Sequence, residues 1–152
     1  MPDADQILDH KDYWDEYLPL PVRDHGLVMR RESSGEGPRG TVKTNVPHRV
    51  ERSSPDGFEF GYGGSGPSDL ALNAVEHLIQ TLAEEGAIDP PSDYYTEEAG
   101  DVEKGQVSKV AFRLAPKLKS KFVAPAPTSG GIVEYDILKP WLLSQLEAQR
   151  EG

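Results

Sequence analysis

The segment FEFGYGGSGPSDLALNAVEHL, residues 58–78, contains the clearest structural signal in the chain. Four glycines and a proline separate an aromatic stretch from a stretch with helical periodicity. Pro67 suits the first position of a helix, and apolar residues recur at helical spacing across Leu70–Leu82. Gly86 is expected to end this helix, since glycine readily adopts the backbone conformation found after a helix. The segment therefore predicts a core helix over about 67–85, entered through a glycine-rich turn.

The rest of the chain predicts an α+β fold, in which a small antiparallel sheet packs against two or three helices in a single domain. Residues 1–24 are interpreted as an acidic N-terminal arm containing a short helix, and residues 25–152 as the domain. The domain includes the glycine-rich motif at 58–85 and an acidic loop at 86–106. Further strands are predicted at 26–31, 41–46, 58–62, 107–115 and 132–135, a strand or extended loop at 48–54, a short helix opened by Pro116, and a terminal helix capped by Asp136.

Composition excludes several classes of protein. The chain has 152 residues and no cysteine, so disulfides, thiolate zinc sites and thiol nucleophiles are ruled out. Its formal net charge of −10 repels a phosphate backbone at long range, and general nucleic-acid binding is not expected. No apolar run has the length of a transmembrane helix, and the N-terminus lacks the pattern of a signal peptide. These observations predict a cytoplasmic protein without a membrane partner.

Charge is unevenly distributed in the second half of the chain. Residues 84–103 contain eight carboxylates and no Lys or Arg, whereas residues 104–121 contain six basic residues and no carboxylate. One interpretation is that the two segments neutralise each other or face solvent. The other is a local basic patch on an acidic protein, kept for one anionic ligand.

Residues 61–66, GYGGSG, match the G-x-G-x-x-G pattern, but the context disfavours a dinucleotide-binding fold. Paired prolines follow the helix where a second buried strand is required, and Pro67 removes a backbone N–H that would face a phosphate. Pro67 also occupies the lysine position of a P-loop. Exposed N–H groups before a helix still permit an anion site, although Asp69 is already close to the helix start. The alternative is a purely structural turn, whose clustered glycines would adopt positive φ, so that valine at Gly63 or Gly64 would be poorly tolerated.

A longer segment, PHRVERSSPDGFEFGYGGSGPSDLALNAV, resembles the signature of a family of small uncharacterised proteins from phages, prophages and bacteria. The family pattern reads P-x-R…S-P-x-G-F-E-x-G-Y-G-G-S-G-P-x-x-L-A-L, and the similarity extends from Pro47 to about Leu82. A weaker similarity lies in KFVAPAP…VEYDILKPWL, near the C-terminus. The acidic first 24 residues and the 86–106 loop depart from the family. The resemblance implies a mobile-element setting, and it implies neither a reaction nor a catalytic residue.

The histidines do not form a recognisable catalytic or metal-binding pattern. His10, His25, His48 and His77 are the only ones, and no two have the i, i+4 spacing of a zinc helix. Ser65 lies in a sequence only superficially like a nucleophile elbow, because the glycine spacing is broken. We therefore expect no catalytic residue, no bound metal and no cofactor, and a non-catalytic role is favoured over an enzyme.

The favoured hypothesis is a binding module for a phosphate-bearing, nucleotide-like ligand at the glycine-rich loop. Tyr62 would stack on a base or ribose, and arginine is suited to bidentate phosphate contacts. Lys117 or Lys119 would assist. The predicted ligand-binding residues are Tyr62, Gly63, Gly64, Ser65, Gly66, Arg49 and Arg52.

The alternative hypothesis is a protein–protein interaction module or a nucleic-acid-mimic inhibitor. Its acidic arm and acidic loop would bind a basic surface on a partner protein, and the glycine-rich motif would be purely structural. A third explanation of the acidity, adaptation to a high-salt cytoplasm, leaves the function open.

Overall fold

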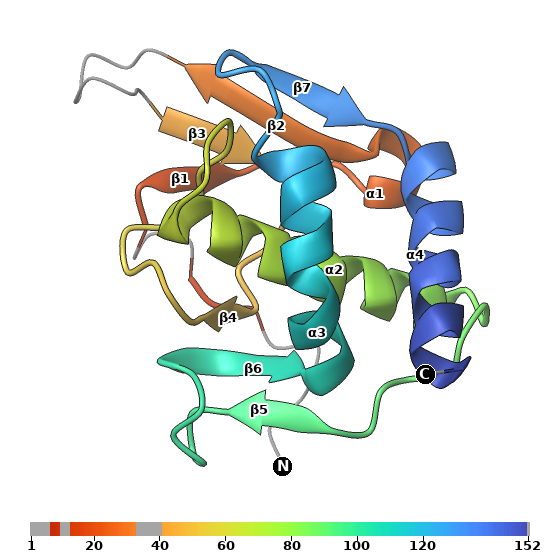
Figure 1. Cartoon of the computed structure of the whole chain (residues 1–152). Helices are drawn as coiled ribbons and strands as arrows, with labels where there is room; N and C mark the ends of the chain where they lie inside the picture. The colour runs from red at the N-terminus through yellow and green to blue at the C-terminus, as the bar shows by residue number, and fades with distance from the viewer. Residues whose placement is uncertain (1–6, 10–12, 33–40, 152) are drawn as a thin grey trace.

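The computed structural model describes residues 7–9, 13–32 and 41–151 of the chain. Helix α2, Ser65–Glu84, runs through the middle of the molecule, with strands on either side of it and helix α3, Lys109–Leu118, packed across it (Figure 1). Residues of α2 and α3 form much of the buried core, together with Phe58 and Phe60. The arrangement confirms the predicted α+β fold.

The larger sheet has four strands in the order β1–β3–β2–β7. Strand β1 pairs in parallel with β3, and the other neighbours are antiparallel. A short helix, α1, Val22–His25, precedes β2. The strands are β1, Asp15–Tyr17; β2, Leu27–Glu32; β3, Thr41–Thr44; and β7, Gly130–Val133.

The smaller sheet is antiparallel, with the order β4–β6–β5. Its strands are β4, Val50–Glu51; β5, Tyr94–Thr96; and β6, Lys104–Ser108. The hairpin of β5 and β6 occupies most of the segment predicted as an acidic loop at 86–106. The turn of this hairpin is closed by a hydrogen bond from the Asp101 N–H to the Thr96 carbonyl.

The C-terminal part of the chain is largely helical. A wider π-helical turn, η2, Lys119–Val123, follows α3 directly, and the terminal helix α4 spans Tyr135–Glu151. Pro116 lies inside α3 instead of opening a separate helix. Because proline has no backbone N–H, it removes one bond of the helical ladder just before the wider turn. None of the helices in the described ranges has both the length and the apolar run that a bilayer crossing requires.

The strand predicted at 107–115 is confirmed only for its first two residues, which end β6, and is wrong beyond them, because Lys109–Leu118 forms α3. The Ser108 hydroxyl accepts a hydrogen bond from the Ala111 N–H at 3.2 Å and caps the helix. Of the alternating residues that suggested a strand, Val110, Phe112 and Leu114, only Leu114 is fully buried in the helix. Helical spacing is the one that buries a complete face, formed by Ala111, Leu114, Ala115 and Leu118.

Two further predictions of local structure are wrong. Residues 58–60 run as an extended segment outside both sheets, and the Phe58 N–H donates to the Asp15 carboxylate. The helix expected near the N-terminus is replaced by strand β1 over Asp15–Tyr17, and its remaining residues lie partly outside the described ranges. Part of the predicted arm is therefore a strand of the larger sheet.

Candidate functional site

Two of the four glycines in the glycine-rich loop are required by the geometry around them. Gly61 has φ = +85°, and a Cβ there would lie 3.2 Å from the Ala126 carbonyl oxygen. Its N–H donates to the Val123 carbonyl at 2.9 Å, which attaches the loop to η2. At Gly66, a Cβ would approach the Glu59 Cβ to 2.7 Å. A side chain at either position would force its neighbours to shift.

Gly63 and Gly64 differ from this pair, and the expectation of positive φ at both is wrong. Gly63 lies outside the left-handed region, and no atom lies within 4 Å of a Cβ built there. Gly64 is extended, with φ = −173°, and caps α2. A Cβ at Gly64 would meet only the ring of Tyr62, which is exposed and can move.

We therefore expect Gly61→Val to lower the free energy of unfolding by about 1–3 kcal/mol, because a β-branched residue is strained at positive φ. Gly63→Val, the matched control on the same loop, is expected to change stability by less than about 0.5 kcal/mol. Urea denaturation of both variants measures the difference. Equal stability of the two variants would contradict the assignment.

An anion-binding arrangement of backbone N–H groups does exist, and an internal carboxylate occupies it. Asp69, in the second turn of α2, is buried and accepts hydrogen bonds from the N–H groups of Arg52, Ser53 and Ser54 at 2.9–3.1 Å. Burial raises the pKa of Asp69, and the three backbone bonds oppose that rise. This carboxylate therefore holds the turn after β4 against the helix.

Other polar residues of α2 hold strands β4 and β6 against the helix. The side-chain amide of Asn73 accepts from the N–H groups of Arg49 and Val50 and donates to the Val50 carbonyl. Glu76 accepts from the backbone and hydroxyl of Ser108 at the end of β6. These contacts give the polar residues of the LALNAVEHL segment a structural role, since each satisfies buried backbone groups.

Arg49 is not brought to the glycine-rich loop. It is buried, and its guanidinium Nη2 lies 3.2 Å from Nδ1 of His77. His77 lies about three helical turns beyond the start of α2. Burial, followed by the adjacent Arg49 charge, lowers the pKa of His77 to about 4.

This pKa predicts a pH dependence of stability. A histidine that is neutral in the folded state and protonated in the unfolded state destabilises the fold as pH falls from about 6.5 to about 4. We expect wild type to lose on the order of 2 kcal/mol of unfolding free energy through His77 between pH 7.0 and 5.0, because its pKa differs by more than two units between the folded and unfolded states. His77→Gln is expected to abolish this part of the pH dependence. Urea denaturation at pH 7.0 and 5.0 measures it. Identical pH dependence of wild type and variant would contradict the assignment.

A cavity of about 340 Å³ lies beside the first turns of α2, against α3. We call it the α2–α3 cavity. Lys119 donates to the Ser68 hydroxyl at 2.7 Å, and the Arg52 guanidinium lies over the Phe112 ring, with its carbon 4.6 Å from the ring centroid. Arg52 also donates to the Asp101 carbonyl. The lining residues are Arg52, Ser53, Ser68, Asp69, Leu72, Phe112, Ala115, Pro116 and Lys119.

The two cations of this cavity have no acidic partner in the described part of the chain. Neither Arg52 nor Lys119 forms an ion pair with a carboxylate in the described ranges. The nearby Asp69 carboxylate is already engaged by three N–H donors. Lys117, the other predicted lysine, donates to Gln145 of α4 instead. The cavity thus presents two uncompensated cations beside the N-terminal turns of a helix.

The remaining predicted residues of the glycine-rich loop do not line this cavity. Tyr62 and Gly63 are exposed on the loop that precedes α2, Gly64 caps the helix, and Ser65 and Gly66 are its first two residues. Sequence reasoning missed Ser53, Ser68 and Phe112. The strand predicted at 107–115 led sequence reasoning to miss Phe112. A helix over the same segment would have placed Phe112 one turn before Pro116, on the same face.

Comparison with known proteins gives one match. Residues 28–89 match the model of a family of unknown function, DUF6166. This range includes the glycine-rich loop and α2, and it stops before α3, which carries Phe112. A search of curated proteins and a search of solved structures found no match.

Proposed function

We propose that this protein binds a small phosphate-bearing, nucleotide-like ligand in the α2–α3 cavity, without catalysing a reaction. The observation that carries the proposal is the convergence of Arg52 and Lys119, from segments 67 residues apart in the sequence, on one cavity beside the start of α2. Neither cation forms an ion pair with a carboxylate within the described ranges, and Asp69, which also lines the cavity, is engaged by three backbone N–H groups. The proposed setting is a mobile genetic element, which rests on the sequence resemblance alone.

The cavity offers separate surfaces for the two parts of such a ligand. The phosphate would lie between the Arg52 guanidinium and the Lys119 ammonium, with the Ser53 hydroxyl as a further donor. The Ser68 hydroxyl already donates to the Gly64 carbonyl and would position Lys119. Leu72, Phe112 and Pro116 supply an apolar wall for a base, and the volume of the cavity is at the small end of the usual range for ligands. The exposed Tyr62 ring, on the loop before α2, would stack on the base or ribose.

Isothermal titration calorimetry with mono- and cyclic nucleotides tests the proposal. We expect Arg52→Gln and Lys119→Gln each to weaken binding about tenfold or more, as the loss of a charge-assisted phosphate contact predicts. Lys117→Gln is the matched control, since Lys117 contacts Gln145 and does not line the cavity. Absence of binding to wild type, or equal loss in the control, would contradict the proposal.

Arg49→Ala is expected to act on stability instead of affinity. Its guanidinium is buried against His77, and neither residue lines the cavity. This variant therefore separates an effect on the fold from an effect on the ligand. Its thermal unfolding and its calorimetric affinity, measured together, give the comparison.

A second candidate function, binding of a basic protein partner, is favoured by one observation. Trp14, just before the edge strand β1, has 82% of its surface exposed, and large aromatic side chains are common anchors of protein interfaces. In this alternative the acidic residues around the β5–β6 turn would contact a basic surface. A pull-down with each of two variants distinguishes the two functions. If the protein binds a basic partner, Trp14→Ala should lose that partner and Arg52→Gln should retain it.

A further inference from the structure

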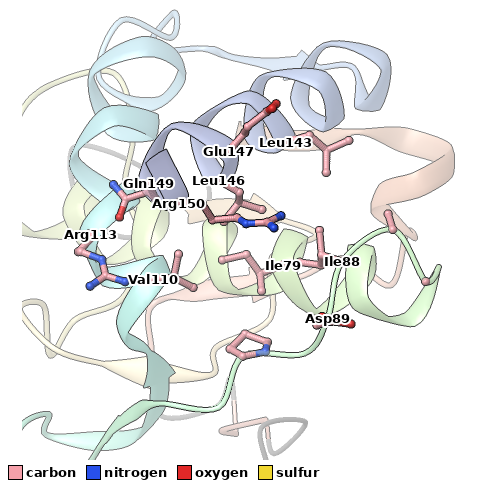
Figure 2. Close-up of a pocket in the computed structure, with 13 residues that line it drawn as sticks. Ile79, Ile88, Asp89, Val110, Arg113, Leu143, Leu146, Glu147, Gln149 and Arg150 are labelled. Atoms are coloured by element: carbon pink, nitrogen blue, oxygen red, sulfur yellow. The ribbon is translucent and has the colours of Figure 1, made fainter. Parts of the chain in front are cut away.

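A second and larger cavity lies near the opposite end of α2 from the α2–α3 cavity. It has a volume of about 1100 Å³ and runs between α2, α3, the segment 86–91 and the C-terminal half of α4. Figure 2 shows its lining, and we call it the α4 groove. Five aliphatic side chains from these four segments form its apolar surface: Ile79, Ile88, Val110, Leu143 and Leu146.

The size of this groove is not explained by imperfect packing. Protein interiors are packed as densely as organic crystals, and the voids within them rarely exceed one water molecule. Ile79 is completely buried, while the other four aliphatic residues are only partly covered by the protein. The groove therefore leaves an apolar surface incompletely covered, and its volume is at or slightly above the upper end of the usual range for ligand sites.

Two arginines reach the same groove from different helices. Arg113 comes from α3 and Arg150 from the last turn of α4. Within the described ranges, neither forms a hydrogen bond or ion pair with another residue. In Figure 2, the Arg150 guanidinium is directed over Ile79 and Ile88. A guanidinium is weakly hydrated and can lie against an apolar surface while it binds an anion.

Two carboxylates, Asp89 and Glu147, also line the groove, and Glu147 lies one helical turn before Arg150 on α4. Figure 2 shows the Glu147 carboxylate directed away from Ile79 and Ile88. Asp89 lies on the segment after α2, on the far side of Ile88 from Arg113. Of these four charged side chains, Arg150 is the one whose charged group lies over the apolar surface in Figure 2.

We propose that the α4 groove binds a small molecule that has an apolar body and one anionic group, such as a carboxylate or a sulfonate. The apolar body would cover Ile88, Val110 and Leu146, and the anionic group would contact the Arg150 guanidinium. Arg113, on the other side of Val110 in Figure 2, would add a second positive charge at the rim. This site is independent of the α2–α3 cavity, with which it shares no lining residue.

A pair of fluorescent probes tests the site. 1-Anilinonaphthalene-8-sulfonate carries a sulfonate on an aromatic frame, and N-phenyl-1-naphthylamine has the same frame without the charge. We expect wild type to bind one equivalent of the sulfonate and Arg113→Gln/Arg150→Gln to bind it about tenfold or more weakly, with binding of the neutral probe unchanged. Arg30→Gln is the matched control, since Arg30 is exposed on β2 and does not line the groove.

A second variant and a competitor sharpen the result. Leu146→Gln, at a partly buried position, is expected to weaken both probes, and decanoate is expected to displace the sulfonate from wild type. Arg52→Gln should leave binding of both probes to the α4 groove unchanged. The test of the α4 groove is therefore independent of whether the α2–α3 cavity binds a nucleotide. Near-UV circular dichroism establishes that each variant is folded.

Three outcomes overturn the proposal. The first is unchanged sulfonate affinity in the double arginine variant, and the second is an equal loss of the neutral probe in that variant. The third is a wild-type dimer, seen by light scattering, that Leu146→Gln dissociates, because a second copy of the chain would then be the occupant.

Discussion

Asp69→Ala is expected to lower the free energy of unfolding by about 3 kcal/mol, as the loss of an acceptor for three backbone N–H groups predicts. Asp69 is 3% exposed, and the donors belong to Arg52, Ser53 and Ser54. Burial of the carboxylate has its own cost, which the raised pKa reflects. Removal of the side chain relieves that cost but leaves the turn after β4 without its acceptor, and the second effect is the larger.

Asp69→Asn is the matched variant, because an amide keeps one of the two acceptor oxygens and almost the same volume. We expect it to lose less stability than Asp69→Ala, and urea denaturation at pH 7 measures both. A loss below about 1 kcal/mol in Asp69→Ala would show that the turn does not depend on this carboxylate. Asp69→Ala should also disturb the position of Arg52, and it should therefore weaken nucleotide binding in the proposed site.

The sequence predicted those elements whose periodicity and end signals agree. Helix α2 combines a proline in its first turn, a long apolar face and Gly86 at its end, and the predicted range differs from the observed one by two residues or fewer. Strands β2 and β3 and helix α4 were also confirmed. The local sequence of such segments agrees with the structure they adopt in the fold, so a single sequence is enough to identify them.

The failures occur where distant contacts select the structure. Residues 107–115 alternate like a strand, but a helix there places Leu114 and Leu118 against α2. Residues 58–60 have aromatic spacing typical of a strand, and the Asp15 carboxylate instead binds the Phe58 N–H. Neither partner is close in sequence, and local periodicity therefore could not identify the outcome.

The candidate site shows the same limit. Arg52 was predicted and lines the α2–α3 cavity, whereas Arg49, three residues earlier, is buried against His77. Both arginines fit an anion site by residue type, and only the position of β4 on α2 separates them. Lys119 lies at the start of η2, within the short helix predicted from Pro116. Its place at the cavity also depends on α3 before it, whose first residues were predicted as a strand.

Leu78→Ala is expected to lower the free energy of unfolding by about 2–5 kcal/mol, the usual cost of deleting a buried leucine side chain. Leu78 is 2% exposed and belongs to the apolar core that α2 shares with α3. The cost combines lost transfer free energy with the cavity left behind, and the central position of α2 limits how far its neighbours can relax. Glu84, on the last turn of the same helix, forms an exposed ion pair with Arg23 at 3.1 Å.

Because exposed ion pairs contribute little, Glu84→Ala is expected to change stability by less than about 0.5 kcal/mol. It is therefore the matched control for a substitution on α2 that leaves the core intact. Urea denaturation of both variants gives the comparison, and the slope of the transition shows whether either alters the unfolded state. A loss below about 1 kcal/mol in Leu78→Ala would mean that α2 is not the centre of the core. The polar contacts of Asp69 and Asn73 would then be its principal attachment to the rest of the fold.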